Sequence, residues 1–192
     1  MSKTDAELIA DSLRGQTEAF GQLVVRFQNR LFHSLVSMLG SPEDARDVAQ
    51  DTFVQAFQKL YTFRGQSAFY SWLFRIALNT AASNRRKKQR VLVSIEAARE
   101  QSGLEIPDMH PDSRPSSGLE TSERQAAVRT ALGELTEEFR TVLVLKEIDG
   151  LRYEEIAEIV DCPIGTVRSR IHRARQELRS KLTHLLQEAA ET

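Results

Sequence analysis

Apolar residues recur at intervals of three or four positions over most of this chain, and this spacing limits what the chain can fold into. It places the apolar side chains on one face of an α-helix, which must then be buried against other helices. The first stripe consists of Phe20, Leu23, Val24, Phe27, Leu31, Leu35 and Met38. Only 9 glycines and 5 prolines interrupt the 192 residues, and no convincing strand pattern is found. The sequence therefore predicts an all-α protein.

Capping residues divide the N-terminal half into successive helices. After Gly40, a helix is predicted from Pro42 to about Leu60, with Ser41 as its N-cap. A loop over 61–66 precedes Ser67, a second plausible cap, and a further helix is expected to reach about residue 86. The predicted inward-facing residues of these two helices are Ala45, Val48, Ala49, Phe53, Ala56, Phe57 and Leu60, followed by Phe69, Trp72, Leu73, Ile76 and Ala77.

The composition changes over residues 91–122. This stretch holds three of the five prolines, and six acidic residues against two basic ones. It is typical of a flexible acidic linker. The helical period returns from Ala127, and a helix is predicted over about 136–148. We therefore expect two small helical domains, 1–90 and 123–192, joined by the linker 91–122.

The C-terminal domain ends in the pattern of a helix-turn-helix. A first helix is predicted over 153–160, where the small Ala157 lets a second helix cross closely. A turn follows over 161–165, because Pro163 cannot continue the first helix. The second helix begins at Gly165 or Thr166 and runs to about residue 186. Its inward-facing stripe is Val167, Ile171, Ala174, Leu178, Leu182 and Leu185.

The opposite face of this second helix is basic. Between residues 165 and 181 there are six lysines or arginines against one acidic residue. In a helix-turn-helix the second helix enters the major groove, where arginine can bind guanine with two hydrogen bonds. The candidate DNA contacts are Thr166, Arg168, Ser169, Arg170, His172 and Arg173. The alternative is a solvated basic face on an ordinary helical hairpin. Cys162 in the turn is expected to be a small buried residue, with a redox sensor as the alternative.

Two features of the N-terminal domain also suit nucleic acid. Six aromatic residues fall between positions 61 and 74. Because Phe63 lies in a predicted loop and Tyr70 and Phe74 are offset from the inward row, some should be exposed. Exposed rings near Arg64 and Arg75 can stack on bases pulled out of a duplex. The stretch 84–90 then carries five basic residues in seven, which indicates either phosphate contact or a solvated helix end.

A third feature suits a protein partner. The predicted helix 42–60 has an acidic, amide-rich outward row. An apolar Val54 within this row favours docking, although a plain solvated face is the alternative. The residues of the row and its flanks are Asp44, Asp47, Gln50, Asp51, Val54, Gln55 and Gln58.

Four motifs, in this order along the chain, resemble the bacterial extracytoplasmic-function sigma factors. The first is Asp44, Asp47, Gln50, Asp51, Thr52 and Phe53; the second is Phe63, Arg64, Gly65, Ser67, Phe69, Trp72, Leu73, Arg75, Ile76, Ala77 and Asn79. The third is Tyr153, Glu154, Glu155, Ile156 and Ala157; the fourth is Gly165, Thr166, Val167, Arg168, Ser169 and Arg170. The resemblance covers nearly the whole chain except the linker.

The resemblance implies a transcription initiation subunit with a sigma-2-like and a sigma-4-like domain. It implies that the helix 42–60 docks on the coiled coil of the largest RNA polymerase subunit, through Asp47, Gln50, Asp51 and Val54. It implies that the aromatic loop and the helix after it bind the −10 element, through Phe63, Arg64, Ser67, Tyr70, Arg75, Asn79 and Arg85. It also implies that Arg168, His172 and Arg173 read the −35 element, and that the linker threads the polymerase's RNA exit path.

The implied partners are core RNA polymerase, including its flap, promoter DNA and an anti-sigma factor. A role in a stress or cell-envelope response follows from the same resemblance, and a cytoplasmic protein is expected. A stand-alone helix-turn-helix regulator with a ligand-sensing N-terminal domain is the main alternative. An enzyme finds little support, because no phosphate loop, nucleophile–base pair or metal-ligand spacing is present. We therefore expect no catalytic residue, metal or cofactor.

Overall fold

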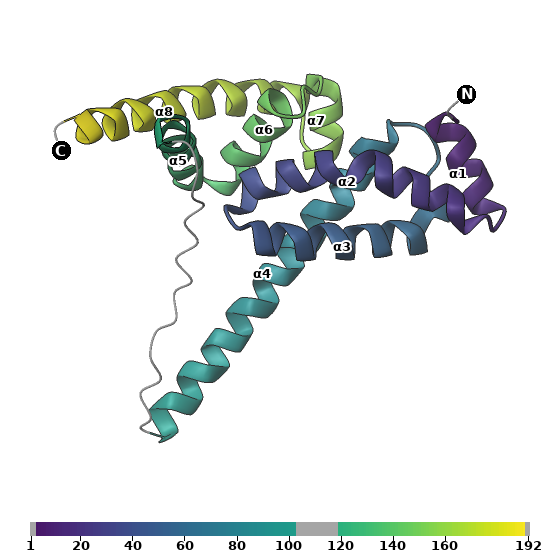
Figure 1. Ribbon diagram of the computed structural model, residues 1–192, viewed down its shortest axis with the longest axis horizontal. Coiled ribbons are helices and arrows are strands. Elements are labelled where there is room, and N and C mark those ends of the chain that lie inside the picture. The colour runs from purple at the N-terminus through teal and green to yellow at the C-terminus, as the bar shows by residue number, and fades with distance from the viewer. Residues whose placement is uncertain (1–2, 103–118, 191–192) are drawn as a thin grey trace.

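The computed structural model describes residues 3–102 and 119–190, and within these ranges the chain forms helices and no strands (Figure 1). This confirms the predicted all-α class. The elements are α1 (Asp5–Leu13), α2 (Thr17–Leu39), α3 (Pro42–Lys59), η1 (Leu60–Thr62), α4 (Phe69–Ser102), α5 (Leu119–Gly133), α6 (Glu137–Glu147), α7 (Tyr153–Val160) and α8 (Ile164–Ala190). No helix in the described part of the chain carries a stretch apolar and long enough to span a bilayer.

Helix α1 was not predicted, although its start carries a recognisable signal. The hydroxyl of Thr4 accepts a hydrogen bond from the backbone N–H of Glu7 at 3.3 Å, and the Glu7 carboxylate accepts one from the Thr4 N–H at 2.7 Å. This reciprocal arrangement is a capping box. The hydrogen bonds from Thr4 lower the pKa of Glu7 because they favour its ionised form. A threonine followed three positions later by glutamate was therefore the signal available in the sequence.

The boundary between α2 and α3 lies where the capping residues predicted it. Gly40 ends α2 with φ 72°, a left-handed conformation that glycine adopts at little cost, and its N–H donates to the Val36 carbonyl at 2.9 Å. Ser41 caps α3 by accepting a hydrogen bond from the Asp44 N–H at 3.2 Å, and Pro42 is the first helical residue. Helix α4 begins at Phe69, two residues after the predicted cap Ser67.

Helix α4 is longer than predicted and extends away from the rest of the protein (Figure 1). It continues to Ser102, so the first part of the predicted linker is helical, and α5 begins again at Leu119. The prolines of the linker lie between positions 107 and 115, which leaves 91–102 without a helix breaker. The centre of the predicted linker, 103–118, lies outside the described residues.

The helix-turn-helix forms from α7 and α8. Asp161 ends α7 in the left-handed conformation, with φ 51°, and the Pro163 carbonyl accepts hydrogen bonds from the N–H groups of Thr166 and Val167. Helix α8 therefore starts at Ile164, one to two residues earlier than predicted. Val167, Ile171 and Ala174 of the predicted apolar stripe are buried.

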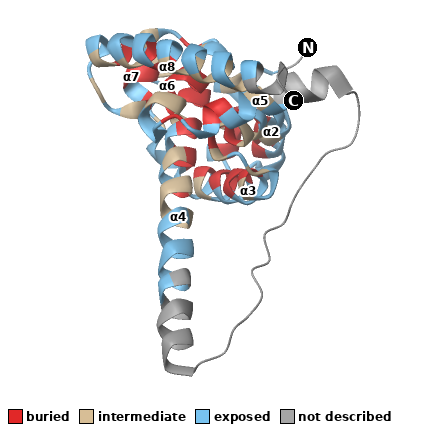
Figure 2. Ribbon diagram, turned by 90° about the vertical axis from the view of Figure 1, so that its left-hand side faces the viewer, coloured by how far each residue is buried: buried red, intermediate tan, exposed pale blue. Residues whose placement is uncertain are grey.

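Buried residues of both halves form a single hydrophobic cluster. This cluster joins α1–α4 to α6, α7 and the start of α8 (Figure 2). The C-terminal half contributes Leu145 of α6, Leu151 of the following loop, and Ile156 and Ile159 of α7, among others. A second, smaller cluster of Leu132, Leu135, Leu143 and Ala174 lies within the C-terminal half. The two halves are therefore packed against each other in this structure.

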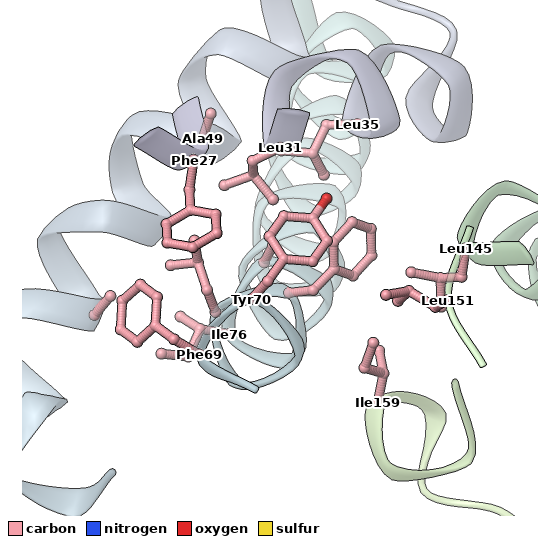
Figure 3. Packing of buried hydrophobic residues seen from close by; sticks show 14 of the residues in the cluster. Phe27, Leu31, Leu35, Ala49, Phe69, Tyr70, Ile76, Leu145, Leu151 and Ile159 are labelled. Atoms are coloured by element: carbon pink, nitrogen blue, oxygen red, sulfur yellow. The ribbon is translucent and has the colours of Figure 1, made fainter. Parts of the chain in front are cut away.

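The expectation that Tyr70 and Phe74 face outward is wrong. Tyr70 is 3% exposed and Phe74 is fully buried. Figure 3 shows Tyr70 between Leu31 and Leu35 on one side and Leu145 and Leu151 on the other. One inward row was predicted for α4, whereas α4 is covered by α2 and α3 and also by the C-terminal half.

Candidate polymerase- and DNA-binding surfaces

The start of α8 presents most of the predicted DNA contacts to solvent. Arg168, Ser169, His172 and Arg173 are exposed, and Thr166 is half-buried. The Arg168 guanidinium lies 5.7 Å from the centre of the Tyr153 ring, a cation–π contact that links it to the first helix of the motif. The Ser169 hydroxyl donates to the Thr166 carbonyl at 2.9 Å. These side chains form an exposed basic face of the kind that a major groove accepts.

Arg170 differs from its neighbours because its guanidinium makes contacts within the C-terminal half. It is half-buried, pairs with Glu138 at 2.8 Å and lies 3.8 Å from the sulfur of Cys162. Cys162 is half-buried and packs against the main hydrophobic cluster, as expected of a small core residue. Further along α8, Arg175 forms two hydrogen bonds to Glu147, which raise the pKa of Arg175.

The aromatic loop places Phe63 in a ring cluster. The Phe63 ring lies 5.7 Å from that of Phe69 and 5.4 Å from that of Trp72, between ring centres. Phe63 and Trp72 are half-buried, whereas the neighbouring Arg64 is exposed. This arrangement offers a partly open aromatic surface on which a base can stack.

Polar side chains of α4 line a cavity between the two halves. Its volume is about 980 Å³, and Arg75, Asn79 and Arg85 on α4 face Glu138 and Arg170 of the C-terminal half across it. Arg85 is ion-paired with Glu137 at the start of α6. Three of the predicted −10 contacts and one predicted −35 contact therefore lie on the walls of the same cavity.

The predicted docking face of α3 is exposed. Asp47, Gln50, Asp51 and Val54 all lie on the solvent side, and Val54 is 52% exposed. The Asp51 carboxylate accepts a hydrogen bond from the Asn84 side chain at 3.2 Å, which ties this face to α4. An apolar side chain among exposed carboxylates and amides is suited to a protein partner.

Tyr70 makes a contact that sequence analysis missed. Its hydroxyl donates to the carboxylate of Asp149 at 2.8 Å, so in this arrangement it is covered rather than presented to DNA. Burial, and then the charge of Asp149, raise the pKa of Tyr70 well above its ordinary range, which keeps the hydroxyl protonated as a donor. Asp149, Glu137 and Glu138 carry no local signal, because their partners lie far away in the chain.

Comparison with known proteins identifies the two halves. The sigma-70 region 2 family model matches residues 23–91, and the sigma-70 region 4 model matches residues 125–178. The first range contains the predicted docking face and the aromatic loop, and the second contains the helix-turn-helix. The fold and these surfaces thus define a sigma-70-type protein, a regulatory subunit of RNA polymerase.

Relatives cover almost the whole chain. The ECF RNA polymerase sigma-E factors of Escherichia coli K12 and Salmonella typhimurium LT2 are 42% identical over 188 residues, which is 95% of this chain and 96% of theirs. That of Haemophilus influenzae is 38% identical, over 95% of this chain and 97% of its own. The chain belongs to the ECF RNA polymerase sigma factors, and it acts in transcription initiation.

Solved structures agree with this assignment. A structure of CnrH in complex with the cytosolic domain of CnrY matches with a TM-score of 0.69 and 30% identity, covering 94% of this chain and 97% of that one. The sigma factor RpoE of Bartonella quintana, in complex with the anti-sigma factor NepR, matches with a TM-score of 0.64 and 30% identity. The match covers 85% of this chain and 96% of that one. Family membership excludes the stand-alone regulator with a ligand-sensing domain.

Proposed function

We propose that this sigma factor uses three separate surfaces: α3 for docking on core polymerase, the Phe63 loop with α4 for the −10 element, and α8 for the −35 element. The observation that carries this proposal is the exposed basic face at the start of α8, set on a buried Val167, Ile171 and Ala174 stripe. Phe63, Arg64, Ser67, Arg75, Asn79 and Arg85 are assigned to the −10 element, and Tyr70 is assigned to the contact between the halves. Residues 91–122 join the domains 1–90 and 123–192 in this proposal.

An anti-sigma factor is the proposed regulatory partner. The solved complexes of CnrH with CnrY and of RpoE with NepR support this, since both are similar to this chain along most of its length. A stress or cell-envelope response is the corresponding physiological role. A protein that acts with core polymerase on the chromosome is expected in the cytoplasm. Promoter melting uses binding energy, so we assign no catalytic residue and no cofactor.

Transcription in vitro with purified core polymerase and a promoter library tests the proposal. We expect initiation from a subset of templates that share two elements. The absence of initiation from every template, together with tight binding of the protein alone to a duplex, would contradict it. A sigma factor should instead bind core polymerase first and bind free promoter DNA weakly.

Asp51→Lys is expected to weaken binding to core polymerase by about 10- to 100-fold, since a reversed charge meets the surface that the carboxylate complements. Fluorescence anisotropy with labelled protein and purified core measures this affinity. Glu158→Lys, the same charge change at an exposed position of α7, is the matched control and should leave the affinity within about twofold. Equal effects of the two variants would rule out α3 as the docking face.

Arg168→Ala is expected to relax the base preference at one position of the −35 element by about 10- to 100-fold, the value of a bidentate arginine–guanine contact. Selection from a library randomised in the upstream element, with the holoenzyme, measures this preference. Arg179→Ala, an exposed arginine about three turns further along α8, should lower binding uniformly or not at all. A preference unchanged by Arg168→Ala would show that another residue reads this position.

A further inference from the structure

Tyr153, the first residue of α7, has an aromatic ring that contacts two cations. The guanidinium carbon of Arg168 lies 5.7 Å from the ring centre, and the Nζ atom of Lys146 lies 4.9 Å from it. Lys146 lies near the end of α6 and Arg168 about one turn after the start of α8, so the ring joins three helices that pack together (Figure 1). Both distances are within the range in which the negative face of an aromatic ring attracts a cation.

The Tyr153 ring is held in place by the rest of the C-terminal half. Tyr153 is half-buried and packs against the main hydrophobic cluster. The N–H of Arg152 donates to the Glu155 carboxylate at 2.9 Å, which satisfies a backbone group at the start of α7. Lys146 donates to the Leu151 carbonyl at 3.0 Å, just before this helix. The ring is therefore a fixed surface, whereas an exposed arginine by itself moves among many rotamers.

The arginines of α8 differ in what already occupies their hydrogen-bond donors. Arg170 pairs with Glu138 at 2.8 Å, and Arg175 forms two hydrogen bonds to Glu147. Carboxylates bind guanidinium groups strongly, so these two arginines must exchange a carboxylate for DNA. Arg168 is exposed and has no carboxylate partner in the described part of the chain. Its donors are therefore available while its guanidinium is held by a ring.

A guanidinium can keep this ring contact and bind a base at the same time. The ring attracts the cation through its face, whereas the N–H donors of the guanidinium lie in its own plane and point outward. The fork that matches the O6 and N7 atoms of guanine thus stays open. Restricting the side chain beforehand also reduces the conformational entropy that is lost when the two hydrogen bonds form.

From these contacts we propose that Tyr153 is a positioning residue for promoter recognition, which holds the Arg168 guanidinium with the face of its ring and so sharpens base reading without touching DNA. This inference rests on the proposed assignment of Arg168 to the −35 element. The Tyr153 hydroxyl forms no hydrogen bond within the described residues, so the ring carries the effect. Phenylalanine should therefore replace Tyr153, and an aliphatic residue should not.

Tyr153→Leu in the full chain tests the proposal, because leucine keeps an apolar side chain at the cluster and removes the ring. We expect the base preference that Arg168 gives at one position of the −35 element to fall by about two- to fivefold, the range of an exposed cation–π contact. Selection by the holoenzyme from a library randomised in the upstream element measures this preference. Tyr153→Phe keeps the ring and should retain the wild-type preference.

Phe139→Leu is the matched control, since Phe139 is also half-buried in the C-terminal half and packs against the smaller cluster. It should leave the base preference unchanged. Urea denaturation followed by circular dichroism compares the stability of the variants. Equal losses of preference in Tyr153→Leu and Phe139→Leu would reveal a general effect of packing and overturn the proposal.

A fluorinated ring provides a test that does not depend on whether Tyr153→Leu folds. Pentafluorophenylalanine at position 153 keeps nearly the shape of phenylalanine, but its fluorines remove the negative potential of the ring face that attracts a cation. We expect the preference to fall as it does in Tyr153→Leu. A preference equal to that of Tyr153→Phe would show that the ring acts by shape alone, which overturns the proposal.

A double-mutant cycle separates positioning from direct contact with DNA. If Tyr153 acts through Arg168, Tyr153→Leu should change the preference no further in a chain that already carries Arg168→Ala. A further loss in that background, or weaker binding of Tyr153→Phe to all sequences alike, would give Tyr153 a DNA contact of its own and overturn the proposal. A preference that rises in Tyr153→Leu would also overturn it, because the ring contact would then be broken when DNA binds.

Failure of this inference and failure of the proposed function have different signatures. A preference that Arg168→Ala relaxes and Tyr153→Leu leaves unchanged contradicts the role of Tyr153 alone. A preference that neither variant changes contradicts the assignment of Arg168 to the −35 element, and the role of Tyr153 with it.

Discussion

Phe63→Ala is expected to slow open-complex formation by about 10- to 100-fold while leaving the affinity for core polymerase unchanged. Stacking of one base on an aromatic side chain contributes about 1–3 kcal/mol, and this interaction forms only once the base has left the duplex. Phe63 contacts Phe69 and Trp72, so the alanine variant opens the ring cluster on its loop side. Permanganate reactivity of unpaired thymines in the −10 region, followed over time, measures the rate.

The matched control is Tyr61→Ala in the same segment. Tyr61 is 77% exposed and lies two residues before Phe63. The alanine variant therefore removes a ring from the surface rather than from the ring cluster. We expect this variant to melt promoters at close to the wild-type rate. Loss of core binding in Phe63→Ala, or equal slowing by both variants, would show that the assigned role of Phe63 is wrong.

Phe74→Ala is expected to lower the free energy of unfolding by about 3–5 kcal/mol, the usual cost of removing a fully buried phenyl ring and leaving a cavity. Phe74 has no exposed surface, and its ring lies 5.8 Å from that of Tyr70, between centres, beside the contact of the two halves. Because small domains are stable by only about 5–15 kcal/mol, this loss is a large fraction of the total. Urea denaturation followed by circular dichroism measures it.

Val91→Ala is the control on the same helix, since Val91 is 57% exposed and lies on the part of α4 that extends from the body. Surface substitutions of this kind change stability by no more than about 0.5 kcal/mol. A change below about 1 kcal/mol in Phe74→Ala would show that the site collapses around the missing ring.

Local sequence signals were sufficient to predict those features of the fold that depend on neighbouring residues. The Gly40, Ser41 and Pro42 boundary satisfies backbone groups within one turn, so it could be located without knowledge of the rest of the fold. The same holds for the turn at Asp161 and Pro163 and for the inward stripe that begins at Val167. The missed α1 also had such a signal, in Thr4 and Glu7.

Averages over long windows were less informative. Counting prolines and acids over 91–122 indicated a linker throughout, although the breakers are concentrated in its centre and α4 continues to Ser102. A helix propagates as long as no residue interrupts its hydrogen bonds, so the position of the first breaker matters more than the composition of the window.

By itself, the sequence determined the helical class and the helix-turn-helix, because each depends on side chains a few positions apart. Only the tertiary structure decided that Tyr70 and Phe74 are buried, that Arg170 pairs with Glu138, and that the side chain of Asp149 is covered. The donors to Asp149 are 79, 115 and 119 positions away along the chain. Burial of a charge depends on what covers it and what neutralises it, and in this protein both come from the other half.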